Sequence, residues 1–171
     1  MRIIAGEFRG RMITSPADPR VRPITGRIKK AWFGILEPHL PDARVVDLFA
    51  GSGSLGLEAL SRGAAHVDFV EFSKPSLTAL GANIAALGVE DRVRIRRADA
   101  LRFAAKLPER AYEVAVADPP FSTDHATRLI AIFRDRPFAA ILALQHRAVL
   151  ELDGDDTRRY GTHALTFCHA P

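Results

Sequence analysis

Short apolar runs alternate with stretches of helical periodicity through most of this chain. Runs rich in Val, Ile and Phe are typical of strands, while apolar residues three and four positions apart are typical of helices. We expect strands near 44–49, 66–71, 92–97, 112–117 and 139–145, and helices at about 54–62, 74–87, 100–106 and 124–133. This alternation predicts βαβ units, a parallel sheet and therefore an α/β fold.

A different pattern precedes these units. Residues 2–14 read as two short strands around a Gly-containing turn, with Arg9 and Arg11 at or just beyond it, so we expect a basic β-hairpin. Three prolines mark 15–23 as a loop. Thr25 can then cap a helix whose apolar stripe consists of Ile28, Ala31, Trp32, Ile35 and Leu36.

The C-terminal part of the chain shows no long helical pattern. Residues 148–152 and 163–168 read as two strands joined through 158–161. We expect this antiparallel hairpin to close the sheet.

The composition fits one globular domain of 171 residues, 47% of them apolar and 26% charged. We divide it into a basic N-terminal hairpin and loop, 1–22, and a core with its N-terminal helix, 23–171.

No run approaches the roughly eighteen apolar residues of a membrane span, and no signal peptide is visible, so we expect a cytoplasmic protein. Cys168 is the lone cysteine and the six histidines are scattered singly, so we expect no metal site. A monomer is the default expectation.

The positive charge is concentrated at the N-terminus. The net charge is +4, but residues 1–30 carry +6 and the rest of the chain −2. Of the 24 basic residues 20 are Arg, which suits forked contacts with phosphate and stacking on bases. A basic arm on a nearly neutral body indicates a nucleic-acid partner, although a solvated surface is the alternative. The arginines expected to bind RNA are Arg9, Arg11, Arg22 and Arg27.

A glycine-rich loop, 51–56, follows the first predicted strand and opens a helix. This G-x-G-x-x-G context is typical of a nucleotide cofactor site, although the glycines also permit close packing of strand and helix. Glu71 ends the next strand, where it can bond two ribose hydroxyls. Nicotinamide dinucleotides and S-adenosylmethionine both present such a ribose.

Three features favour S-adenosylmethionine. Asp47 places a carboxylate near the amino-acid end of the cofactor, where it would attract a methionine ammonium and repel a pyrophosphate. Asp99 can accept from the adenine amino group while also capping a helix. The chain is also short for a dehydrogenase with a separate substrate domain. The expected cofactor site comprises Asp47, Gly51, Ser52, Gly53, Glu71, Asp99, Ala100 and Asp118.

The tetrapeptide Asp118-Pro119-Pro120-Phe121 ends the strand at 112–117. Two prolines forbid continuation of the strand, so the chain turns there. The carboxylate of Asp118 and the carbonyl of Pro119 can accept hydrogen bonds from the two N–H groups of an exocyclic amine, and Phe121 can stack on the base. These two hydrogen bonds rehybridise the amine nitrogen, and orientation of its lone pair toward the methyl group then supplies most of the catalysis. We therefore assign catalytic roles to Asp118, Pro119 and Phe121.

These motifs resemble those of a known family, the bacterial 16S rRNA guanine-N2 methyltransferases of the RsmD type. The run at 47–63 is highly specific, whereas the tetrapeptide is shared with many amino-methyltransferases. The matching segments cover nearly the whole chain: Arg2–Gly6, Arg9–Arg11, Arg22-Pro23 with Thr25 and Arg27, 47–63, Asp118–Phe121, and Arg159–Gly161 with Leu165 and Thr166.

The resemblance implies a Rossmann-like class I methyltransferase fold, a mostly parallel seven-stranded sheet with an antiparallel C-terminal strand. It also implies S-adenosylmethionine as methyl donor and one guanine of 16S rRNA, in the 30S subunit or an assembly intermediate, as target. The family's cofactor roles carry over to Gly51, Gly53 and Glu71, and its base-holding roles to the tetrapeptide. Departures occur at Ile24, Gly26, Lys30 and Gln145; the family usually has Thr at the first position and an acid at or near the others.

Two alternatives remain open. The acceptor can be adenine N6 in DNA, although the chain has no sizeable target-recognition insert. The protein can also be an inactive rRNA-binding assembly factor, against which the intact Asp118, Glu71 and glycine loop count. His125 lies close enough to Phe121 in sequence to line the substrate mouth, but surface or capping duty is the expected role.

Overall fold

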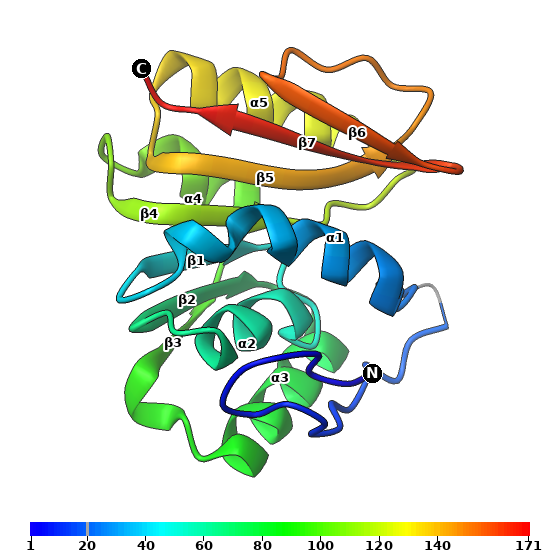
Figure 1. The fold of residues 1–171 in the computed structure, drawn as a ribbon, viewed down its shortest axis with the longest axis vertical. Helices are drawn as coiled ribbons and strands as arrows, with labels where there is room; N and C mark the ends of the chain where they lie inside the picture. The colour runs from blue at the N-terminus through cyan, green and yellow to red at the C-terminus, as the bar shows by residue number, and fades with distance from the viewer. Residues whose placement is uncertain (20) are drawn as a thin grey trace.

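The computed structural model describes residues 1–19 and 21–171. Its centre is a seven-stranded sheet in the order β3-β2-β1-β4-β5-β7-β6 (Figure 1). The first five strands are parallel, β7 runs antiparallel to β5, and β6 antiparallel to β7. This confirms the predicted methyltransferase-like sheet. The strands are β1 (Arg44–Leu48), β2 (His66–Glu71), β3 (Val93–Arg97), β4 (Tyr112–Ala117), β5 (Ala139–Arg147), β6 (Asp156–Tyr160) and β7 (His163–His169).

Helices cover both faces of the sheet. Helices α1, α2 and α3 share one apolar core with one face, and α4 and α5 share a second core with the other (Figure 1). In the described part of the chain, no helix is both long and apolar enough to cross a membrane. The helices are α1 (Gly26–Leu36), α2 (Ser54–Ser61), α3 (Lys74–Leu87), α4 (Ala100–Lys106) and α5 (His125–Asp135), with 3-10 turns at Glu37–His39 and Glu90–Arg92.

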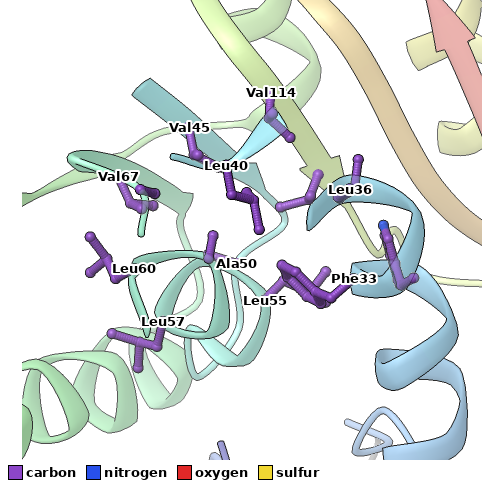
Figure 2. Close-up of a cluster of buried hydrophobic side chains, with 14 of the residues drawn as sticks. Phe33, Leu36, Leu40, Val45, Ala50, Leu55, Leu57, Leu60, Val67 and Val114 are labelled. Atoms are coloured by element: carbon purple, nitrogen blue, oxygen red, sulfur yellow. The ribbon is translucent and has the colours of Figure 1, made fainter. Parts of the chain in front are cut away.

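Helix α1 begins where the sequence predicts. The side chain of Thr25 accepts a hydrogen bond from the Ile28 amide at 3.3 Å and so caps the first turn. Its buried stripe includes Trp32, Phe33 and Leu36, all fully buried. Phe33 and Leu36 point toward α2 and the sheet (Figure 2). The predicted stripe members Ala31 and Ile35 only border this core.

The N-terminal arm, residues 1–14, differs from the predicted hairpin. Its two halves form one isolated antiparallel bridge, between Arg2 and Met12, rather than two strands. Backbone bonds from Ile3 to Arg11 and from Ile13 to Met1 flank this bridge. Other arm amides donate to side chains of α2 and α3: Ile4 and Ala5 to Glu58, Phe8 to Ser61, and Thr14 to Asn83. The arm therefore lies across these helices and owes its shape to them.

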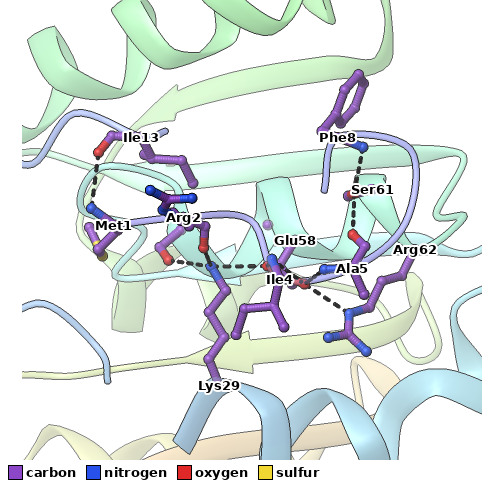
Figure 3. A network of polar contacts seen from close by, with 12 residues as sticks. Met1, Arg2, Ile4, Ala5, Phe8, Ile13, Lys29, Glu58, Ser61 and Arg62 are labelled. Carbon is purple, nitrogen blue, oxygen red and sulfur yellow. Dashed lines mark hydrogen bonds and ion pairs between the residues drawn. The ribbon is translucent and has the colours of Figure 1, made fainter. Parts of the chain in front are cut away.

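Glu58 is the anchor of this arrangement (Figure 3). Its fully buried carboxylate pairs with Lys29 at 3.0 Å and with Arg62 at 2.9 Å, besides accepting the two arm amides. The Lys29 ammonium also donates to the Arg2 carbonyl at 3.0 Å. A buried ion pair is tolerable when further hydrogen bonds satisfy its remaining sites, as here. One carboxylate thus joins the arm, α1 and α2.

The C-terminal strands also differ from prediction. The expected strand at 148–152 is wrong, because β5 continues to Arg147 and residues 148–155 form the following loop. The residues predicted as the turn, 158–161, belong mostly to β6. The apolar run that suggested a strand is exposed at Val149, whose side chain is 85% accessible. The apolar character of Val149 therefore does not indicate burial.

Candidate active site

Polar side chains from five adjacent strands line the edge to which the parallel strands point. In the register, Asp47 of β1 lies beside Phe69 and Val116. Glu71 and Asp118 lie two residues beyond those partners, so all three acids share one face of the sheet. By the same alternation Gln145 of β5 and His163 of β7 join that face. It is the face covered by α1, α2 and α3.

Asp47 supports the glycine loop through a hydrogen bond from the first turn of α2. Its carboxyl is almost fully buried, and Oδ2 accepts a hydrogen bond from the Gly56 amide at 2.8 Å. Burial raises the pKa of Asp47 well above its ordinary value; the Gly56 amide opposes this, while the charges of Asp118 and Glu71 reinforce it. Asp47 therefore shapes the loop, whatever it contributes to a ligand.

The three glycines of the loop differ in what surrounds them. A Cβ at Gly56 would lie 2.3 Å from Phe69 Cε1, and one at Gly53 would lie 2.5 Å from Leu80 Cδ1. These two glycines permit the close packing of α2 on the sheet and on α3. Gly51 has φ of +57° and open space where a Cβ would be, so only this glycine presents bare backbone outward.

Glu71 is held by the backbone around it. Oε2 accepts from the Gly51 amide at 2.8 Å, while Oε1 accepts from Phe72 at 2.8 Å and Ser73 at 2.9 Å. These bonds occupy three of the roughly four acceptor positions of a carboxylate. The loop after β1 and the loop after β2 are thereby tied together beside Gly51.

Two further positions complete the expected cofactor site. Asp99 caps α4 by accepting from the Arg102 amide at 2.8 Å through Oδ1, and Ala100 is buried beneath it. Ser52 is buried, and its carbonyl accepts from the Asn83 side chain at 2.9 Å. This arrangement fits S-adenosylmethionine. The open backbone at Gly51, the carboxylate of Glu71, which suits ribose hydroxyls, and the exposed Asp99 would hold it.

The tetrapeptide forms a locked turn at the end of β4. Thr123 donates its hydroxyl to the Pro120 carbonyl at 2.7 Å. Asp118 is half-buried, and burial raises its pKa to about 7. The ring of Phe121 lies 5.2 Å from that of His163, with a 60° angle between the rings. The turn, β5 and β7 therefore meet around Phe121.

Four residues around the site had no predicted role in it. Phe49 adopts φ of +61°, unusual for a residue with a side chain, and stacks on His125 at 5.5 Å. Phe72, next to Glu71, is 63% exposed. Gln145 and His163 follow from the two-residue alternation of strands only once the register is known. Thus His163, rather than His125, touches Phe121.

The arginines expected to bind RNA fall into two groups. Arg22 and Arg27 are exposed near the start of α1, on the side to which β5 points (Figure 1). Arg9 is exposed on the arm, and Arg11 donates to the Ala86 carbonyl at 2.6 Å in the last turn of α3. Helix α3 has 14 residues, so Arg11 lies about 20 Å from the helix start beside Glu71. The arm arginines therefore lie away from the tetrapeptide.

The different glycine environments lead to a prediction. Gly51→Ala should weaken S-adenosylmethionine binding at least about 10-fold, because a methyl would intrude on the open loop. Gly56→Ala should instead destabilise the fold by about 1–3 kcal/mol through overpacking against Phe69. Calorimetric titration and urea unfolding measure the two effects. If Gly51→Ala leaves the affinity unchanged, the loop is not the cofactor site.

The sequence of this chain is similar to those of known proteins. A family model described as Conserved hypothetical protein 95 matches residues 1–158. The chain is similar to Ribosomal RNA small subunit methyltransferase D of Escherichia coli strain K12, with 36% identity over 144 residues, 84% of this chain and 72% of that protein. Putative rRNA methyltransferase YlbH of Bacillus subtilis strain 168 is 34% identical over 134 residues, 77% of this chain and 73% of that protein.

Solved structures show the same fold over nearly the full length. A hypothetical protein of Thermus thermophilus, TTHA0928, matches with a TM-score of 0.85 at 32% identity, covering 99% of each chain. Putative methyltransferase yhhF of Escherichia coli matches with a TM-score of 0.83 at 29% identity, covering 98% of this chain and 96% of that one. The chain therefore belongs to the Conserved hypothetical protein 95 family, which confirms the resemblance to methyltransferases of the RsmD type.

Proposed function

We propose that this protein transfers a methyl group from S-adenosylmethionine to the exocyclic N2 of a guanine in 16S rRNA. One observation carries the proposal: Asp118 and Pro119 lie at the carboxyl edge of β4, on the strand next to the one that leads into the Gly51 loop. An acceptor pair for an amine thus lies beside a cofactor cradle. The similarity to proteins named rRNA methyltransferases supports RNA as the substrate class.

Each part of the cofactor site has a proposed task. S-adenosylmethionine supplies an electrophilic methyl group on a sulfonium when bound. Gly51, with Ser52 and Gly53, lets the backbone approach it, and Glu71 accepts from the ribose. Because Glu71 already holds three amides, we expect one hydroxyl to take its remaining acceptor position and the second to compete with the Gly51 amide. Ala100 and Asp99 face the adenine, and Asp47 supports the loop.

The tetrapeptide positions the amine. Asp118 Oδ and the Pro119 carbonyl accept its two N–H bonds, so the nitrogen lone pair is freed from the ring and given one direction. Phe121 offers a face for the base. A carboxyl with a pKa of about 7 can also take up the proton that the amine loses on methylation.

Two alternatives lead to different products. A DNA adenine methyltransferase would use the same acceptors on N6, and an inactive assembly factor would bind rRNA without transferring a methyl group. The preorganised Glu71 and the turn after Asp118, which Thr123 closes on Pro120, favour an active enzyme over the inactive factor. The choice of guanine rests on the resemblance of the sequence motifs to RsmD-type enzymes rather than on the turn, which any exocyclic amine fits.

The decisive experiment supplies labelled methyl donor with three substrates in parallel. These are undermethylated 30S particles, naked 16S rRNA, and DNA, with the product nucleoside identified by chromatography and mass spectrometry. We expect N2-methylguanosine at one position of the RNA. N6-methyladenine would overturn the proposed acceptor, and no methylated product from any substrate would leave only the binding-factor alternative.

Asp118 should impose a pH dependence on catalysis. Its raised pKa means that the required carboxylate forms as pH rises through about 7, so kcat/KM should increase over that range and then level off. Asp118→Asn should lower kcat/KM at least about 100-fold, and the remaining activity should no longer rise with pH near 7. Cofactor affinity within a few-fold of wild type and an unchanged or higher Tm would show that the variant is intact. A wild-type rate in Asp118→Asn would refute the mechanism.

The arm arginines should affect RNA affinity without affecting chemistry. Replacing both Arg9 and Arg11 with Gln should weaken binding and reduce the slope of log K against log salt by about 2, if each contacts one phosphate. The single-turnover rate at saturating RNA should stay unchanged, because both residues lie away from Asp118. Arg94→Gln plus Arg136→Gln, two exposed arginines outside the arm, is a matched control of equal charge change. An equal effect of the two pairs would indicate general charge attraction rather than a specific arm contact.

A further inference from the structure

Gln145 is a polar residue in the otherwise apolar central part of β5. It is 5% exposed, and the six preceding residues of the strand are all apolar. The parallel register pairs Ala117 with Leu144, so the next residues along, Asp118 and Gln145, are neighbours on one face. Gln145 also lines a small hollow together with Pro119 and Phe121. It therefore adjoins the residues that would hold the amine.

The two ends of the Gln145 amide are in different situations. Nε2 lies 3.3 Å from His163 Nδ1, and the same His163 ring contacts Phe121. Oε1 is buried and has no hydrogen-bond partner among the described residues. Leaving a buried carbonyl without a donor is costly, and such groups in native structures call for an explanation. A ligand that donates an N–H to Oε1 would supply the missing hydrogen-bond donor.

We propose that Gln145 Oε1 accepts the N1–H of the target guanine and so selects guanine at this site. In guanine the N1–H adjoins the exocyclic 2-amino group, so an acceptor beside Asp118 and Pro119 is in the right place. Adenine has a bare acceptor at N1 and would leave Oε1 unsatisfied. His163 is the positioning residue, since its contact with Nε2 leaves Oε1 as the amide atom without a partner among the described residues. The inference rests on the proposed guanine chemistry and adds the group that distinguishes the base.

The hydrogen bond to N1 is needed because Asp118 and Pro119 alone do not distinguish guanine from other bases. Asp118 and the Pro119 carbonyl accept from any exocyclic amine. A third acceptor that meets a ring N–H is satisfied by guanine and opposed by any base with a lone pair at that position. A site built to bond a donor rejects analogues lacking it strongly, because its own buried group is then left unpaired.

The test compares guanine with 2-aminopurine at the methylated position, once product mapping has located it. 2-Aminopurine keeps the 2-amino group but has no hydrogen on N1. Wild-type protein should prefer guanine in single-turnover kcat/KM by about 10-fold or more. Gln145→Leu, which removes the acceptor at similar volume, should reduce this preference to about twofold or less. Gln145→Glu, the matched control that keeps an acceptor, should retain the preference.

The outcomes separate this inference from the proposed function. If wild-type protein makes no N2-methylguanosine, the proposed function fails first. If it does, and folded Gln145→Leu keeps the full preference for guanine over 2-aminopurine, the role of Gln145 is refuted while the function stands. Thermal unfolding of each variant checks folding. A loss of activity on both bases by the same factor would also refute selection, because it would indicate only a structural role.

Discussion

The pairing register of β2, β1, β4, β5 and β7 is the constraint on which the site depends. Because side chains alternate along a strand, a shift of one residue would move a polar group to the opposite face. The observed register brings Glu71, Asp47, Asp118, Gln145 and His163 onto one face at one edge. The hydrogen-bonded ladders thus place the expected cofactor acid and the expected base-holding turn on adjoining strands.

A second constraint is the close packing of α2. Gly53 and Gly56 allow this helix to lie against Leu80 and Phe69, and Asp47 fixes its first turn. One turn further along α2, Glu58 bonds the N-terminal arm and pairs with Lys29 of α1. Helix α2 therefore joins the loop at the site to the arm on the other side, and leaves Gly51 as the glycine with open space beside it.

Sequence reasoning succeeded where local chemistry decides structure. Consecutive prolines must end β4, and the loop opened by Gly51 is recognisable from the strand before it and the helix after it. It failed at 148–152, where Val149 is apolar but exposed, and it missed that the short backbone pairing of the arm is supplemented by bonds with Glu58, Ser61 and Asn83. Such contacts join residues more than fifty positions apart, and no local pattern encodes them.

The sequence by itself determined the fold class, the family, the cofactor type to expect, and the position of the turn at Asp118 that we propose holds the amine. These depend on short-range features: periodicity, glycine and proline geometry, and motif order. Only the tertiary structure decided which of the three loop glycines has open space beside it, that the arm packs beside Arg9 on the last residue of α2, and that Gln145 lies beside Asp118 with a carbonyl oxygen that has no partner among the described residues. The physical reason is that these properties arise from register and packing between distant segments.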